Sequence, residues 1–371
     1  MKKVFALLSL FCCFAALLVS CGSDKEREPV NAGSEIIGHV TDSHSWHLFD
    51  YESKDGEDHA VAIPLPVILI NNGHLDIFLS SKFHHGHADY MGYRLIGGGQ
   101  EKEEVACVDS EGNLVTDSEG NVKKPLDLSI TKTSAAIMVA VILLIVIVFA
   151  AKKGYRKRPN QAPKGLQSLV ELLVVFVRDD IVKPMIGEKH YRRYLPYLLT
   201  LFFFIFFCNI LGLIPIFPAG ANINGSLAVT ATLAVITFFI TNISGNKHYW
   251  TDIFNTPGVP AWLKIFPLMP VVELVGVFTK PIVLMIRLFA NMTAGHIVIL
   301  GFIFIIYIMS QLFGVVAGGA VSVVSVFFCV FISLLECLVA YLQAFVFTML
   351  SALYIGMAVE EPHHGEVNTA E

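Results

Sequence analysis

The sequence predicts an all-α polytopic membrane protein with five membrane-spanning helices, the last two long and tilted as a hairpin, and a small exported segment before them. Of its 371 residues, 54% are apolar and only 15% are charged, whereas an ordinary soluble domain has about 25% charged residues. The apolar residues gather in runs long enough to cross a hydrocarbon core of about 30 Å. The net charge of −5 offers no basic surface, so we expect no nucleic-acid partner.

The amino terminus has the pattern of a secretory signal. A basic start precedes the apolar run Val4–Val19, which is typical of a signal peptide and predicts one over residues 1–20. The run ends in Leu18-Val19-Ser20-Cys21, which resembles a bacterial lipobox and makes Cys21 a lipidation candidate. Ordinary cleavage after a small residue and an uncleaved anchor are the alternatives that this pattern leaves open.

Residues 21–133 are predicted to form an exported extension. Ala60–Ile70 and His74–Ser80 are short runs of β type, and Asn71-Asn72-Gly73 between them predicts a hairpin turn. Three nearly adjacent histidines are weak candidates for a metal site, with solvation in a polar loop as the alternative: His84, His85 and His87.

Residues 134–193 are predicted to hold the first span and a cytoplasmic loop. The apolar run Ala135–Ala151 is long enough to span, and eleven Lys or Arg residues lie between Lys152 and Arg193. The positive-inside rule places this loop in the cytoplasm and the amino terminus outside. Within the loop, Leu166–Val182 is apolar but interrupted by charges, so we expect it to lie along the membrane surface.

Residues 194–267 are predicted to hold the second and third spans. These spans are Tyr194–Phe217 and Ala228–Ile243, and the connection Pro218–Gly225 has no Lys or Arg, as an outside loop should. Residues 359–371, which follow a long helical hairpin described below, are predicted to form a cytoplasmic tail.

Residues 268–358 are predicted to form a long helical hairpin. Its two apolar segments run from Leu268 to about Met309 and from Val321 to about Val359. Forty-odd helical residues extend about 60 Å, twice the hydrocarbon thickness, so the helices must be tilted or bent, and Pro281 offers a bend. The glycine-containing segment Ser310–Ala320 is predicted to be the outside connection.

Ionisable residues interrupt this apolar hairpin, which marks them as candidates for function. Arg287 lies about twenty residues from either end of its segment, too far to reach an interface. A guanidinium keeps its proton in proteins, so Arg287 can act only as a fixed positive charge. A structural salt bridge with Glu336 is the alternative.

Helical spacing indicates which face of the helix each of the other polar residues of the hairpin occupies. Asn291 lies one turn after Arg287 on nearly the same face, and Lys280 and Glu273 precede it at seven-residue steps. His296 is nine residues after Arg287 and therefore points to the opposite side.

The last segment carries a second polar face. Glu336 and Gln343 are seven residues apart and share a face of the helix. A histidine that titrates near neutral pH beside a carboxylate can relay protons, so His296 and Glu336 are relay candidates. A packed polar residue is the alternative for each one taken singly.

Three segments carry a resemblance to a known family. Arg287-Leu288-Phe289-Ala290-Asn291-Met292-Thr293-Ala294-Gly295-His296 resembles the signature of F-type ATP synthase subunit a. Leu342-Gln343-Ala344-Phe345-Val346-Phe347 and Asn209-Ile210-Leu211-Gly212-Leu213-Ile214-Pro215 resemble its last-helix and second-span motifs. The resemblance covers about residues 134–358.

The resemblance implies roles for the matching residues. Arg287 matches the arginine that faces the carboxylate of the rotor helix, Gln343 the glutamine packed near it, and Asn291 a residue lining the outer half-channel. Glu273 matches an acidic position of the inner exit path.

The resemblance also identifies the relay pair. His296 and Glu336 match its two positions in the outer half-channel. Many bacterial members of the family have the acid on the first helix and the histidine on the second, so this chain has the pair in reversed order.

The resemblance implies a stator subunit of a rotary ATP synthase that forms two proton half-channels and couples proton flow to rotation. Its partners would be a ring of carrier subunits c, the peripheral-stalk subunit b, the remainder of the complex and membrane lipid. It would lie in a bacterial inner membrane. Protons and sodium ions both remain possible coupling ions.

Other classes are less well supported by the sequence. We expect no cofactor and no nucleotide site, because no phosphate-binding glycine loop is present; ATP chemistry would belong to the partners. A secondary ion or solute transporter is the alternative function, although we find no internal repeat of the kind such transporters have. The His-Glu-x-x-His and Gly-x-Ser-x-Gly patterns of membrane hydrolases are missing.

Overall fold

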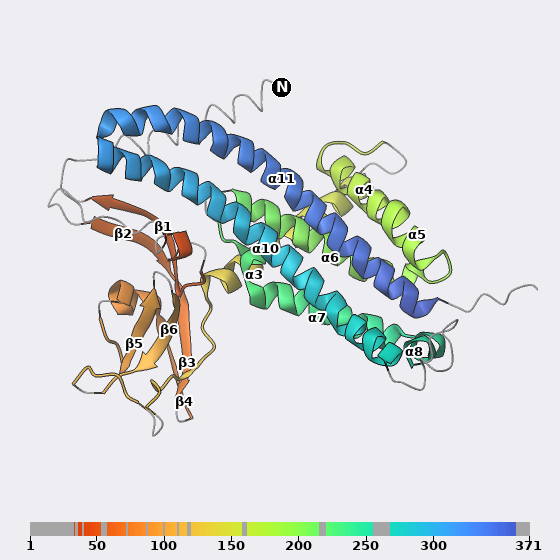
Figure 1. The fold of residues 1–371 in the computed structure, drawn as a ribbon, viewed down its shortest axis with the longest axis horizontal. Coiled ribbons are helices and arrows are strands. Elements are labelled where there is room, and N and C mark those ends of the chain that lie inside the picture. Colours follow the sequence, from red (N-terminus) through yellow and green to blue (C-terminus); the bar gives the residue numbers. More distant parts are fainter. Residues whose placement is uncertain are drawn as a thin grey trace, which may run out of the picture. The chain divides into compact units, whose positions relative to one another are not determined.

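A computed structural model gives the fold of the protein (Figure 1). It describes residues 33, 36–38, 41–52, 58–71, 73–86, 88–98, 101–109, 111–116, 120–157, 162–214, 220–254 and 268–360. The predicted signal peptide, Cys21, His87 and all but the first two residues of the predicted tail lie outside the described residues. The chain divides into two compact units, one of Met1–Val139, Leu211–Ile223 and Thr293–Leu338 and one of the remaining residues.

The extension is built of β-strands. Its strands pair in three small antiparallel sheets, β1 with β2, β4 with β3 and β7, and β5 with β6. The strands are β1 (Ser45–Glu52), β2 (Asp58–Pro64), β3 (Pro66–Asn71), β4 (His74–Leu79), β5 (Tyr93–Gly98), β6 (Glu101–Cys107) and β7 (Leu126–Asp127), with the 3₁₀ turn η1 at Ser80–Gly86.

The β3–β4 hairpin lies where the sequence predicts it. Asn71 faces His74 across the ladder, which leaves a two-residue turn, and Gly73 has a φ of 85° that glycine adopts without strain. The expected run Ala60–Ile70 is divided into two strands between Pro64 and Pro66, because proline lacks the N–H that a continuous ladder needs. One face of these strands contributes to a buried cluster of Val67, Leu69, Phe83, Tyr93, Val105 and Cys107.

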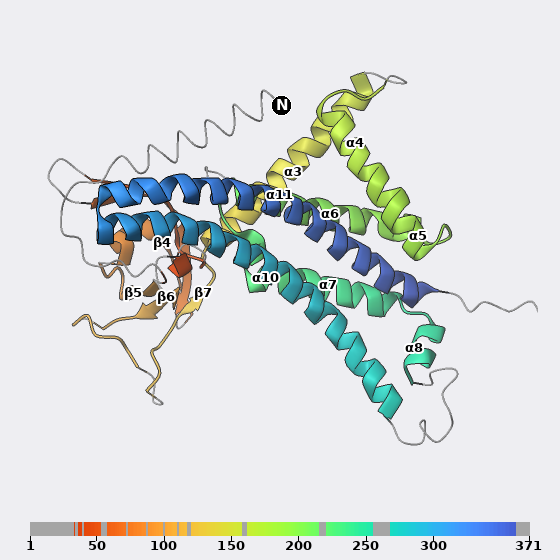
Figure 2. The ribbon, with the colours of Figure 1, turned by 45° about the horizontal axis from the view of Figure 1, so that its top comes forward.

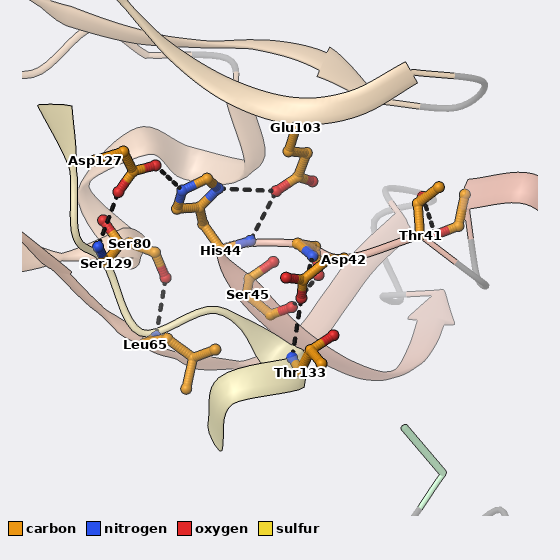
Figure 3. A network of polar contacts seen from close by, with 12 residues as sticks. Thr41, Asp42, His44, Ser45, Leu65, Ser80, Glu103, Asp127, Ser129 and Thr133 are labelled. Atoms are coloured by element: carbon orange, nitrogen blue, oxygen red, sulfur yellow. Dashed lines mark hydrogen bonds and ion pairs between the residues drawn. The ribbon is translucent and has the colours of Figure 1, made fainter. Parts of the chain in front are cut away.

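His44, near the start of the extension, is hydrogen-bonded to Asp127 near its end (Figure 3). The His44 side chain is almost fully buried, its Nε2 lies 2.8 Å from Asp127 Oδ2, and its backbone N–H donates to Glu103 Oε2. Burial disfavours the charged imidazole, but hydrogen bonds to Asp127 and Glu103 outweigh it and raise the pKa of His44 from 6.5 to about 9. The neighbouring Asp42 carboxylate accepts from the backbone N–H of Thr133 at 2.9 Å, in the first turn of the following helix.

Five helices in the described part of the chain are long and apolar enough to cross a membrane, as the sequence predicts. The second ends at Leu213, and residues 215–217 of the span expected there lie outside the described residues. The helices are α3 (Lys132–Lys157), α6 (Tyr191–Leu213), α7 (Leu227–Ser244), α10 (Leu268–Phe313) and α11 (Val315–Val359).

Helices α10 and α11 form the predicted antiparallel hairpin (Figures 1 and 2). They have 46 and 45 residues and extend about 70 Å each, and Pro281 lies inside α10 without ending it. The predicted connection Ser310–Ala320 is wrong in extent, because helix continues on both sides of Gly314 alone. Gly314 has a φ of 81°, the left-handed conformation that ends a helix within one residue.

The segment Leu166–Val182 is helical and packs within the second unit. It comprises α4 (Leu166–Phe176) and the π-helical turn η2 (Val177–Val182), which continue into α5 (Lys183–Ile186). The side chains of η2 that are fully buried enter a core formed mainly by α6, α10 and α11. The short helix α8 (Lys247–Phe254) follows α7. The position of α4 along a membrane surface stays a prediction.

Candidate functional site

Arg287 is exposed in α10, next to a buried glutamine of α11. Gln343 is 5% exposed, and its Nε2 donates to the backbone carbonyl of Arg287 at 3.3 Å. This contact holds the two helices together beside the guanidinium and leaves the guanidinium itself unobstructed. An open hollow of about 330 Å³ lies there, lined by Arg287, Asn291, Val339, Leu342, Gln343 and Val346.

Within the described residues, no carboxylate lies within 4.0 Å of the Arg287 guanidinium. The structural salt bridge that the sequence left open is therefore not present. Apart from Asn291, the exposed side chains around Arg287 include the aliphatic residues Ile282, Val283, Ile286 and Leu342. A charge on such a face of a membrane helix is costly unless it is paired or hydrated, which marks Arg287 as a candidate functional residue.

His296 and Glu336 lie together in the first unit. His296 Nδ1 is 3.8 Å from Glu336 Oε1, and Glu336 is 8% exposed. Neither carboxylate oxygen of Glu336 has a hydrogen-bond partner among the described residues. A buried carboxyl group with free oxygens can bind a proton or a water molecule there.

The backbone of α6 orients the His296 ring. Gly212, near the end of α6, presents its carbonyl to His296 Nε2 at 3.2 Å. A carbonyl only accepts, so Nε2 carries the hydrogen in the neutral ring and Nδ1 is left with a lone pair directed at Glu336. The 3.8 Å gap is wider than a hydrogen bond and is a distance that one water molecule or a small side-chain movement closes.

Gly295 is a site residue that the sequence analysis did not single out. A Cβ built on Gly295 would collide with the carboxylate of Glu336. Glycine at this position therefore lets the Glu336 side chain lie against α10. The signal in the sequence was a glycine inside an apolar helix, directly before His296.

A buried pair of asparagines is hydrogen-bonded inside the second unit. Asn209 in α6 donates to the Ala340 carbonyl of α11 at 3.1 Å and accepts from Asn224 Nδ2 at 2.6 Å. Both side chains are about fully buried, and such amides persist in an apolar core because they are hydrogen-bonded. The sequence analysis used Asn209 only as part of a motif and did not single out Asn224.

Lys280 does not line the Arg287 hollow, although helical spacing put it on the same face. Its Nζ lies 5.3 Å from the centre of the Tyr354 ring, and it lines a separate small cavity with residues of α7, including Thr237 and Thr241. Glu273, about two turns before Lys280, is partly buried in α10 and also lies outside the residues that line the hollow.

The histidines of the extension form no metal site in the part of the chain that is described. His84 is exposed in η1, and no group of three His, Cys, Asp or Glu side chains there could hold a metal ion. His87 and the side chain of His85 lie outside the described residues.

Comparisons with known proteins agree with the two-part sequence. The family model described as ATP synthase A chain matches residues 134–356, and one described as a domain of unknown function matches residues 35–128. Similar curated proteins include ATP synthase subunit a 2 of Chlorobaculum tepidum, 48% identical over 247 residues, which are 64% of this chain and 66% of that protein. ATP synthase subunit a of Chloroherpeton thalassium is 44% identical over 65% of this chain and 69% of its own length.

A third similar relative comes from another organism. ATP synthase subunit a of Myxococcus xanthus is 44% identical over 64% of this chain and 76% of its own length. The ATP synthase A chain model covers well over half of the chain and includes all five membrane-type helices almost completely. The protein is therefore a multi-pass membrane protein that belongs to the ATP synthase A chain family.

Proposed function

We propose that this protein is the stator subunit a of a rotary ATP synthase, which carries protons through two half-channels past a ring of carrier helices. The observation that carries the proposal is Arg287, an exposed cation on a largely aliphatic helix face without a carboxylate partner among the described residues. A rotor helix with an ionisable carboxyl group is the partner that such a face requires. The relatives named ATP synthase subunit a support the same function.

Arg287 acts as a fixed charge in this mechanism. It attracts the ionised carboxylate of an arriving rotor helix, which has released its proton to the inner half-channel. Because the guanidinium does not release its own proton, it cannot pass protons directly between the half-channels and so prevents leakage. Each charge that moves through 100 mV releases about 2.3 kcal/mol, so several protons are needed for each ATP.

The resemblance assigns His296, Glu336 and Asn291 to the outer half-channel. With Nε2–H held by the Gly212 carbonyl, the Nδ1 lone pair of His296 is the position that accepts a proton on the Glu336 side. Glu336, with two free oxygens, takes the proton from Nδ1 and releases it toward the rotor carboxylate, which becomes neutral. A neutral carrier can rotate into lipid at little cost in free energy.

Gln343 and Glu273 complete the proposed path. Gln343 holds the Arg287 backbone and thereby the position of the charge. Glu273 is assigned to the inner half-channel on the resemblance alone.

The partners follow from the same assignment. They are a ring of subunits c against the Arg287 face, the peripheral-stalk subunit b, and the catalytic part of the complex. The chain lies in a bacterial inner membrane with its amino terminus outside, because the eleven basic residues follow the first span. The secondary-transporter alternative is not favoured, since the family match covers every span.

Arg287→Ala tests the proposal in inverted vesicles that bear the complex. We expect ATP-driven acidification to fall by about 100-fold or more, the size typical of removing a preorganised charge, while the complex stays assembled. Ile286→Ala, at the adjacent exposed aliphatic position, is the matched control and should pump normally. Undiminished pumping by the Arg287→Ala complex would contradict the assignment.

An exchange of the two relay residues tests the outer half-channel. His296→Glu and Glu336→His each leave two like groups at the pair, so each single variant should pump poorly. The double variant restores one imidazole and one carboxyl group across the same gap, and we expect it to recover a large part of the loss. A double variant no better than the single ones would show that the two residues do not act as a pair.

A further inference from the structure

The sheet formed by β4, β3 and β7 has an apolar outer face that no described residue covers. Alternate residues of β3 and β4 face each other on this side, Pro66 with Leu79, Ile68 with Ile77 and Ile70 with Leu75. Leu126 of β7 lies opposite Ile70. The sheet-face patch is therefore Pro66, Ile68, Ile70, Leu75, Ile77, Leu79, Leu126 and Leu128.

The patch is exposed although the opposite face of the sheet already supplies the core. Val67 and Leu69 on the opposite face are fully buried, whereas Leu75 is 58%, Ile77 63% and Leu79 49% exposed. Leu126 and Leu128 at the other edge are 60% and 55% exposed. An antiparallel sheet with one buried face normally has polar residues on the other, and a contiguous apolar patch on a protein surface marks an interaction site.

The backbone connects this patch directly to a membrane helix. Leu128 N–H donates to the Ile68 carbonyl and Ile130 N–H to the Pro66 carbonyl, which extends the ladder of β7. The next alternate residue, Lys132, is the first of α3 and donates to the Ser43 carbonyl at 2.8 Å. Four residues reach at most about 14 Å, so Leu128 must lie within that distance of the end of a membrane-spanning helix.

The composition of the patch distinguishes lipid from protein as its partner. All eight side chains are aliphatic or proline, whereas protein interfaces concentrate binding energy in Trp, Tyr and Arg. An apolar face that lies on a bilayer enters the boundary between headgroups and acyl chains to a depth of about 5–10 Å.

We propose that the sheet-face patch docks the extension on the phospholipid surface of the membrane, on the side from which α3 starts. The strand that leads into α3 brings the sheet to the interface, and the patch enters the outer part of the leaflet. This interaction is separate from the proton path, and it does not depend on the assignment of Arg287, His296 or Glu336.

A photoreactive benzophenone side chain at position 77 tests the proposal in the full chain. The complex is assembled and reconstituted into vesicles of phosphatidylethanolamine and phosphatidylglycerol, irradiated, and its adducts are identified by mass spectrometry. Position 111 is the matched control, because Glu111 is exposed in the turn after β6 and lies outside the patch. We expect phospholipid adducts from position 77 in several-fold excess over position 111.

Position 126 provides an independent variant on the opposite edge of the sheet. Leu126 is as exposed as Ile77, so a benzophenone there should also give phospholipid adducts if the whole face is docked. Adducts with another subunit or a second copy of this chain would assign the patch to a protein partner and overturn the proposal. Equal, low lipid yields at positions 77, 126 and 111 would show that the patch faces water and would also overturn it.

Discussion

Glu336 shows how much a single glycine decides at the scale of residues. Its carboxyl group is buried against α10 at a place where any side chain on residue 295 would occupy the same space. Van der Waals overlap of this kind is relieved only by moving the carboxyl group or separating the helices. The proposed relay distance between His296 and Glu336 therefore depends on a residue that has no polar atom in its side chain.

Gly295→Ala should impair proton pumping without removing a titratable group. The new methyl group displaces the Glu336 carboxylate, which lengthens its separation from His296. We expect ATP-driven acidification by inverted vesicles to fall by about tenfold or more, since small misplacements of reacting groups have large effects on rate. Gly301→Ala in the same helix is the control, because a Cβ there meets nothing within 4 Å. Equal pumping by both variants would contradict the role of Gly295.

His44 makes the stability of the extension depend on pH. Its folded pKa of about 9 lies above the ordinary 6.5, so its stabilisation is complete below about pH 6.5 and is lost as the pH rises through 9. Burial by itself would raise the pKa of Asp127. Hydrogen bonds from His44 and Ser129 outweigh this effect and lower the pKa to about 2. Its stabilisation is present above about pH 4 and is lost as the pH falls through 2. The extension should be most stable between about pH 4 and pH 6.5.

Alkylation of the buried Cys107 in the membrane-bound full chain measures this pH dependence. Cys107 is 5% exposed in the core of the extension, so it is alkylated only when the extension opens. The alkylation rate of the unfolded chain divided by that of the folded protein at the same pH gives the protection, and hence the free energy of opening. We expect the free energy of opening to fall by no more than about 3 kcal/mol between pH 6 and pH 9.5. His44→Gln should lose most of this dependence. The same decline in both proteins would rule out His44 as its source.

At the scale of elements, the packing of α11 on α5 depends on close backbone contact. A Cβ on Gly356 would overlap the Met185 carbonyl of α5, and neighbouring Ile355 and Val359 are buried in the same core as Ile181 and Ile186. Helices that approach this closely need small residues at the contact. This contact explains why Leu166–Val182, although charged, belongs to the helical core of the second unit.

Gly356→Ala should destabilise the protein, even though alanine favours helix. Helix propensity gains about 1 kcal/mol, while overpacking a rigid contact costs about 1–3 kcal/mol, and the colliding atom is a backbone oxygen that cannot rotate away. We expect a lower midpoint of thermal unfolding in detergent and less assembled complex. Gly319→Ala on the same helix meets nothing within 4 Å and should be neutral or stabilising. A midpoint as high for Gly356→Ala as for Gly319→Ala would disprove the close contact.

At the scale of the whole molecule, two modules are joined without a free linker. The family matches end at residue 128 and begin again at residue 134, and the residues between them are hydrogen-bonded to β3 and to Ser43. The Asp42 carboxylate, which accepts from Thr133 N–H, adds a second attachment at the start of α3. These hydrogen bonds leave the connection between β7 and the start of α3 short and attached to the extension.

Much of this organisation is predictable from the sequence, because it depends on local rules. Five apolar runs of sufficient length predict five spans, and Asn-Asn-Gly between two β-type runs predicts the β3–β4 hairpin. The length of the last two runs predicts the long hairpin of α10 and α11. The extent of its connection was wrong, because glycine-rich composition indicates a loop, whereas one left-handed residue at Gly314 is enough to reverse the chain.

The sequence by itself determined the class of the protein, the number of its spans and the identity of the charged residues within them, since hydropathy and ionisation are properties of residues and not of their neighbours. Tertiary structure decided which of those residues meet. Helical spacing placed Lys280 with Arg287, but packing against Tyr354 and α7 separates it from the hollow. The contacts of Glu336 with Gly295 and of His296 with Gly212 join residues 41 and 84 positions apart. Side chains so distant in the chain come together only through the angle and depth at which helices pack, and that is fixed by the whole set of contacts at once.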